Sequence, residues 1–161
     1  MPARVSAGSH PFAFAQVALS YYDDSNHGGP MAMLDLSLKV LIVDDMMSMR
    51  NIVKRALLEI GYQNVHEALN GEEALGKLKS GGFGLVLLDW NMPVMSGIEL
   101  LRTIRADSAL QTLPVLMITA EAKMENIMEA VQVGVSDYLV KPFSGQALQE
   151  KLEKIFQKLS K

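Results

Sequence analysis

The 161-residue chain contains no cysteine, which excludes a disulfide framework and any metal site built on thiolates. This absence suits a reducing compartment, and we expect a cytoplasmic protein. A basic excess is missing as well, because 15 lysines and arginines stand against 18 aspartates and glutamates, for a net charge of −3. Nucleic-acid binders usually carry the opposite balance, so we expect no nucleic-acid partner.

Long apolar runs are also missing. No apolar stretch reaches the roughly 18 residues that a membrane span requires, so we expect no association with a membrane. The short apolar segment 11–19 resembles the core of a secretory signal, but no small-residue cleavage site follows it. We therefore interpret this segment as part of an extension and not as a signal peptide.

Residues 1–36 differ from the rest of the chain. They are rich in glycine and proline and show no sustained periodicity of 2 or 3.6 residues. We expect an extension that is mostly disordered, followed by one domain at 37–161, and the 49 % apolar content of the chain is ample for its core. A docking arm is the alternative for the extension, although its sequence offers this reading little support.

From Lys39 onward, short apolar runs alternate with stretches of helical spacing. Apolar runs without internal alternation are typical of parallel strands covered on both faces. The predicted strands are 40–43, 64–68, 85–88, 115–118 and 138–140. Each is followed by a predicted helix, the first of which has Ser48 as a candidate N-cap and Gly61 just past its end. Five strand–helix units indicate an open, doubly wound α/β fold with five parallel strands and helices on both faces.

Acidic side chains stand where two of these strands end. Asp44 and Asp45 close the first strand, and Asp89 closes the third. In open parallel sheets the ligand site lies beyond the carboxyl ends of the strands, where the strand order reverses. Three carboxylates at one rim repel one another unless a cation is present, and Mg²⁺ prefers such oxygen ligands. We expect Asp45 and Asp89 to bind Mg²⁺ directly and Asp44 through water, with the backbone carbonyl of Asn91 as a further ligand.

Two more polar residues belong to the same rim, Thr119 at the end of the fourth strand and Lys141 just after the fifth. An ammonium group, a hydroxyl and a cation together can hold the oxygens of a phosphoryl group. Asp89 would then be the nucleophile that becomes an acyl phosphate. An acidic pair before a helix is often only a cap, and a lone Lys-Pro is usually only a turn. All of these residues at the ends of the right strands favour a functional site over capping.

The chain from about Leu38 to Lys161 resembles the receiver domain of bacterial two-component response regulators, in particular the single-domain chemotaxis members. The resemblance covers about three quarters of the chain and includes spacing as well as motifs. The motifs that carry it are Val43-Asp44-Asp45, Asp89-Trp90-Asn91-Met92-Pro93, Thr119-Ala120-Glu121-Ala122-Lys123 and Tyr138 through Val140-Lys141-Pro142-Phe143.

The resemblance implies a role for each matching residue. Asp89 is then the phosphoacceptor for a histidine kinase, and Lys141 and Thr119 are the phosphate-binding pair. Asp44, Asp45 and the carbonyl of Asn91 form the Mg²⁺ site with Asp89. The family further implies the strand order 2-1-3-4-5 and a cis peptide bond between Lys141 and Pro142.

The resemblance also implies an output. Tyr138 corresponds to an aromatic switch that fills the space vacated when Thr119 moves toward the phosphoryl group. A partner surface is expected on the last two helices and the fifth strand, with Lys123, Ile127, Lys151 and Lys154 as candidate contacts. Lys151 and Lys154 are three residues apart and so lie on one side of their helix; a merely solvated cationic face is the alternative there.

The expected partners are a histidine kinase of the chemotaxis type, a flagellar motor switch protein and a phosphatase, and we expect a monomer. Met46, Ser96 and Asp137 depart from the chemotaxis pattern and leave the pathway open. One alternative is an enzyme of the Mg²⁺-dependent aspartyl-phosphate phosphatase type. Such enzymes usually need a second Asp as general acid two residues after the nucleophile, where this chain has Asn91. The other alternative is a receiver in a phosphorelay unrelated to motility.

Overall fold

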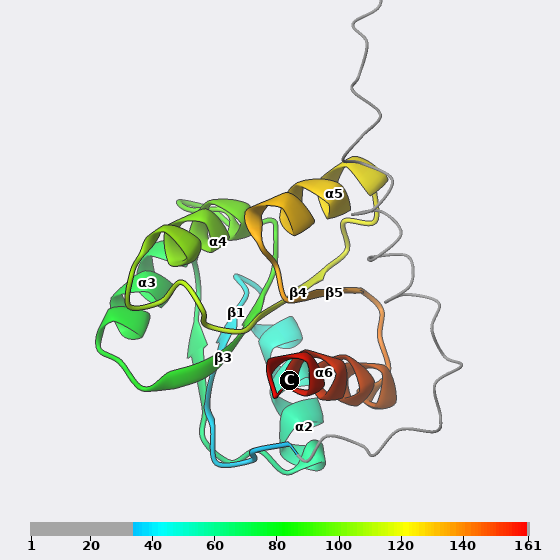
Figure 1. Ribbon diagram of the computed structural model, residues 1–161. Helices are drawn as coiled ribbons and strands as arrows, with labels where there is room; N and C mark the ends of the chain where they lie inside the picture. The colour runs from blue at the N-terminus through cyan, green and yellow to red at the C-terminus, as the bar shows by residue number, and fades with distance from the viewer. Residues whose placement is uncertain (1–33, 161) are drawn as a thin grey trace, which may run out of the picture.

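The computed structural model describes residues 34–160, in which strands and helices alternate strictly (Figure 1). The strands are β1 (Lys39–Val43), β2 (Val65–Ala68), β3 (Phe83–Leu88), β4 (Val115–Thr119) and β5 (Asp137–Val140). The helices are α2 (Met47–Ile60), α3 (Gly71–Lys79), α4 (Gly97–Ala106), α5 (Met124–Val133) and α6 (Gly145–Leu159). All neighbouring strands are parallel, in the order β2-β1-β3-β4-β5, which confirms the predicted fold and strand order.

The sheet separates two apolar layers, and alternate residues of each central strand point into opposite layers. Leu41 and Val43 of β1 pack with α3, α4 and α5, whereas Val40 and Ile42 pack with α2 and α6. Figure 1 shows this division, with α2 and α6 together on one side of the sheet. Because both faces are covered, the three central strands β1, β3 and β4 are largely apolar runs, as the sequence predicts, whereas the edge strand β2 contains the polar residues His66 and Glu67.

The start of α2 differs from the prediction. Met46 is the N-cap residue and makes no side-chain cap, while the predicted cap Ser48 lies within the first turn. The reason is that the Asp44 carboxylate accepts the backbone N–H of Met46 at 2.9 Å, which ends the preceding turn two residues earlier. Gly61 ends the helix as predicted, with a backbone φ of 125° and its N–H donated to the Leu57 carbonyl.

Two residues just before the predicted domain start at 37 make packing contacts. Leu34 packs against the α2–α6 layer, and the Leu36 side chain lies against Gly61. Packed structure therefore includes residues that the sequence assigns to the extension, whose residues 1–33 lie outside the described part. Within 34–160, no helix has the length and apolarity to cross a membrane.

Candidate phosphorylation site

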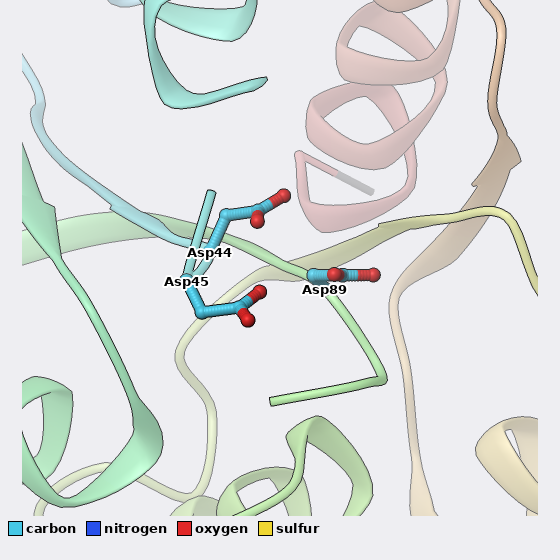
Figure 2. A group of neighbouring side chains, drawn as sticks. All are labelled: Asp44, Asp45 and Asp89. Carbon is cyan, nitrogen blue, oxygen red and sulfur yellow. The ribbon is translucent and has the colours of Figure 1, made fainter. Parts of the chain in front are cut away.

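The sheet register brings the acidic residues of β1 and β3 together. Val43 pairs with Leu88, so the next residues, Asp44 and Asp89, leave the sheet side by side. The N–H of Asp89 donates to the Val43 carbonyl at 3.0 Å. One carboxylate oxygen from each of Asp44, Asp45 and Asp89 lies within 4.8 Å of the others. Figure 2 shows the three side chains grouped at this edge of the sheet. Asp44 and Asp89 are buried and Asp45 is exposed, so the cluster opens to solvent on the Asp45 side.

Lys141 supplies the positive charge of the site. Its Nζ lies 2.8 Å from Oδ2 of Asp44 and 3.7 Å from Oδ2 of Asp89, and its side chain is only 12 % exposed. The Lys141 N–H donates to the carbonyl of Thr119 at 2.9 Å, which ties the end of β5 to that of β4. The Lys141–Pro142 peptide bond is cis, as expected. Four of the predicted residues thus converge from four different strands.

The Asp89 carboxylate lies in a mixed electrostatic environment. Burial raises its pKa above the usual value, and the neighbouring Asp44 carboxylate raises it further. The Lys141 ammonium, the Thr119 hydroxyl and the N–H of Trp90 act in the opposite direction, and the Trp90 N–H donates to Oδ1 at 2.8 Å. A buried carboxylate held by a cation and two hydrogen-bond donors has a fixed orientation.

The loop after β3 folds back tightly onto Asp89. Gly97, the first residue of α4, donates its N–H to the Trp90 carbonyl at 2.8 Å. A Cβ placed on Gly97 would lie 2.0 Å from the carbonyl oxygen of Asp89, so no larger residue fits without movement. Within the loop, Val94 has a φ of 72°, which is strained for a β-branched residue. The loop geometry therefore fixes the backbone of Asp89 from behind.

Arg50 of α2 supports the site and received no role from the sequence. Its guanidinium is buried, donates to the Asp44 carbonyl at 2.9 Å and pairs with Glu67 of β2 at 3.2 Å. The signal available was its position three residues before Val53, which places a charged residue on the buried face of the helix. Arg50 thereby fastens the end of β1 to both α2 and β2.

Glu121, in the loop after β4, joins several predicted residues. Its carboxylate accepts the side-chain amides of Asn91 at 3.0 Å and of Asn126 at 2.9 Å. Its N–H donates to the Thr119 hydroxyl at 3.3 Å, and its carbonyl accepts the Tyr138 hydroxyl at 2.6 Å. Glu121 belongs to a motif that carries the family resemblance, but the sequence alone gave it no role. The structure makes it the link between the acidic site and Tyr138.

The candidate output residues differ in exposure. Lys123 is exposed, whereas Ile127 and Tyr138 are buried. Of the two candidate contacts on α6, Lys154 is half-buried and Lys151 is buried, so the alternative of a merely solvated cationic face does not describe Lys151. Its side chain is 11 % exposed and pairs with the buried Asp137 at 3.2 Å, because β5 packs directly against this side of α6.

Comparison with known proteins shows which family and which proteins the chain is similar to. Residues 40–153 match the family described as "Response regulator receiver domain". The chain is 56 % identical over 128 residues to chemotaxis protein CheY-3 of Vibrio cholerae, across 80 % of this chain and 98 % of that protein. It is 54 % identical over 123 residues to chemotaxis protein CheY of Pseudomonas aeruginosa, across 76 % of this chain and 99 % of that one.

Solved structures agree with the fold. The structure of V. cholerae CheY4 matches with a TM-score of 0.69 and 39 % identity, over 74 % of this chain and 98 % of that chain. The CheY of a CheX–CheY–BeF3–Mg complex from Borrelia burgdorferi matches with a TM-score of 0.70 and 28 % identity, over 74 % and 89 % of the two chains.

Proposed function

Because the chain belongs to the response regulator receiver domain family and is CheY-like, we propose that Asp89 is the phosphoacceptor of a chemotaxis response regulator. A histidine kinase of the chemotaxis type donates the phosphoryl group, and the phosphorylated protein signals by binding another protein. The observation that carries the proposal is the position of the Asp89 carboxylate between Lys141, Thr119 and the acidic pair.

The transfer follows from the positions of these groups. An Asp89 carboxylate oxygen attacks the phosphorus of phosphohistidine, the P–N bond breaks, and its electron pair stays with the imidazole nitrogen, which takes up a proton. Lys141 and Thr119 lie where they can hold the phosphoryl oxygens as charge develops on them. The only chemistry proposed for the chain is this self-catalysed phosphorylation and the later hydrolysis of the acyl phosphate, which releases inorganic phosphate.

The residues present fit Mg²⁺. Carboxylates of Asp44, Asp45 and Asp89 within 4.8 Å of one another are hard oxygen donors, the kind of ligand that this ion prefers. The carbonyl of Asn91, in the loop that follows Asp89, is the proposed fourth protein ligand. Mg²⁺, when bound, would offset the repulsion between these carboxylates and the phosphoryl oxygens. A solved CheX–CheY complex that contains Mg supports the assignment by likeness.

We further propose that the output surface consists of α5, β5 and α6. Tyr138 is fixed to Glu121, and Glu121 is fixed to Thr119, so a movement of the Thr119 hydroxyl toward a phosphoryl group changes the support of the Tyr138 ring. Lys123, the N-cap residue of α5, is exposed, Lys154 of α6 is half-buried, and the buried Ile127 belongs to the same apolar cluster as Tyr138. The proposed partners are the chemotaxis kinase, a flagellar motor switch protein and a phosphatase of the CheX type, with the receiver acting as a monomer.

The phosphorylation assignment is tested by intact mass. The protein is incubated with acetyl phosphate and Mg²⁺, and one phosphoryl adduct is expected, sensitive to chelation of the metal. Asp89→Asn should show no adduct, whereas Asp107→Asn, which alters an aspartate at the far end of α4, should keep it. An adduct that persists in Asp89→Asn would sink the assignment.

A further inference from the structure

The feature that the phosphorylation chemistry does not use is the buried ion pair between β5 and α6. Asp137 and Lys151 are each 8 % exposed, and Oδ1 of Asp137 lies 3.2 Å from Nζ of Lys151. The same Oδ1 accepts the N–H of Tyr138 at 2.8 Å. Removing two charges from water is costly, and such pairs are often less stabilising than apolar residues of similar size. Stability alone is therefore a weak explanation for a buried ion pair directly beside Tyr138.

The pair lies at the end of a hydrogen-bonded series that begins at the acceptor site. The Thr119 hydroxyl accepts the N–H of Glu121, whose carbonyl accepts the Tyr138 hydroxyl, and the Tyr138 N–H is bound by Asp137. Asp137 then binds Lys151 on α6. Every member of this series contacts the next through a polar group, so a displaced Tyr138 backbone alters the acceptor that holds Lys151.

Lys151 also belongs to a cationic row. Lys151, Lys154 and Lys158 follow the spacing i, i+3, i+7 and so lie on one side of α6. Burial lowers the pKa of Lys151, and Asp137 opposes that shift. The positive charges of Lys154 and Lys158 also lower the pKa of Lys151. Lys158 is exposed and Lys154 is half-buried. Asp137 thus pairs with the buried member of this row, and exposure increases along the row to Lys158.

We propose that Asp137 is a positioning residue that holds Lys151 inward in this conformation, and that opening the pair completes a cationic face for an acidic segment of a partner protein. The cationic face is defined as Lys151, Lys154 and Lys158. Complementary charge is the argument for the acidic partner, because opposite potentials attract and orient the two surfaces. The inference rests on the proposed output surface, and it assigns to Asp137 an internal competition with the partner for Lys151.

The first test measures how accessible Lys151 is in the full chain. Amine acylation followed by peptide mass spectrometry should label Lys151 slowly in the wild type and about tenfold faster in Asp137→Asn, since a hydrogen bond to a charged group shifts an equilibrium by roughly this factor. Lys141, whose side chain is also 12 % exposed, serves as the internal control for global opening. Faster labelling of Lys151 with unchanged Lys141 supports the proposal. Unchanged labelling of Lys151 overturns it.

The second test measures binding to an acidic probe, a fluorescein-labelled peptide of twelve glutamates, by anisotropy at low salt. Asp137→Asn should tighten binding about tenfold, and the added change Lys151→Met should remove the gain. Glu150→Gln makes the same change of charge at an exposed position of α6 without freeing Lys151. An equal gain in Glu150→Gln would show that net charge alone is responsible and would overturn the proposal.

Neither test needs phosphate, so both stand or fail separately from the phosphoacceptor assignment. Should Asp137→Asn not fold, the wild type is labelled with and without acetyl phosphate and Mg²⁺. The proposal then requires faster acylation of Lys151 only in the fraction that carries the adduct. Equal labelling in phosphorylated and unphosphorylated protein, with the adduct confirmed by mass, contradicts the coupling of Lys151 to Asp89.

Discussion

Gly97 is the residue whose replacement tests the close packing behind Asp89, the proposed phosphoacceptor. In Gly97→Ala the new methyl group would lie 2.0 Å from the carbonyl oxygen of Asp89 and 3.0 Å from Cα of Trp90. Non-bonded carbon and oxygen atoms do not approach this closely, so the two backbones must separate by roughly 1 Å. Both are held by the sheet and by α4, and overpacking of this kind costs about 1–3 kcal/mol. We expect the cost of Gly97→Ala in folding free energy to lie near the upper end of this range.

The matched control is Gly76→Ala. Gly76 lies in the middle of α3, is exposed, and a Cβ placed there would meet no atom within 4 Å. Alanine at an unobstructed helix position lowers the entropy lost on folding, so this change should stabilise the protein by about 0.5–1 kcal/mol. The same chemical substitution is therefore expected to have opposite signs at two positions of one chain.

Urea unfolding followed by far-ultraviolet circular dichroism measures both variants. With an m-value of about 1–3 kcal/mol/M, a loss of about 3 kcal/mol lowers the urea midpoint of Gly97→Ala by roughly 1–3 M. The folded fraction of this variant should also acquire the acetyl phosphate adduct more slowly than the wild type, since the backbone of Asp89 is displaced. A midpoint equal to that of the wild type would refute the claim that the loop has no room.

Three further predictions concern the charges of the site. Burial raises the pKa of Asp89 above 3.8, so its ionised form destabilises the fold; Asp89→Asn should raise the urea midpoint at pH 7, and this gain should shrink as the pH falls toward 3.8. Mg²⁺ at one hundred times its Kd should raise the free energy of unfolding by about 2.7 kcal/mol, and Asp45→Asn should lose most of that rise in thermal melts. Arg50→Met should lower the free energy of unfolding by about 1–3 kcal/mol, because the buried carbonyl of Asp44 loses its donor. Lys54→Met removes the exposed partner of the same Glu67 and should lower it by at most about 1 kcal/mol. An equal midpoint at every pH, no effect of Mg²⁺, or equal costs for the two α2 variants would contradict the respective prediction.

The sequence predicts the sheet well because its signals are local and repeated. Apolar runs such as Val40 to Val43 identify the central strands, and Gly61 marks the end of α2 as observed. The predicted start of α2 is wrong for a physical reason. Ser48 is a good capping residue by type, but the Asp44 carboxylate takes up the N–H of Met46, and the helix begins before Ser48 can act as a cap.

The candidate site is predictable for a different reason. In a parallel sheet the strand ends share one edge, so Asp44, Asp89, Thr119 and Lys141 must be neighbours once the strands are identified. Their convergence does not depend on any side-chain rotamer. Lys151 shows the limit of this reasoning, because helical spacing gives its side of α6 but does not say that β5 covers that side.

The sequence did not predict several side-chain pairs, because the partners are distant in sequence and the pairing depends on side-chain reach. Arg50 meets Glu67 across 17 residues, Asn91 meets Glu121 across 30, and Asp137 meets Lys151 across 14. No periodicity in a single sequence encodes such pairs, since many polar residues occupy equivalent surface positions.

The difference between strand-end positions and individual side-chain contacts has a functional consequence. The groups proposed to receive the phosphoryl group lie at strand ends, whose position is fixed by the fold. The proposed route from Thr119 to α6 runs instead through individual polar contacts. If Asp137 holds Lys151 inward as proposed, one substitution at Asp137 changes which cations the proposed output surface presents, while the geometry around Asp89 stays the same. Two receivers with identical strand-end residues would then accept phosphate alike and still differ in the partner they bind. For this chain, Asp137 and Lys151 are the pair at which that difference should be sought.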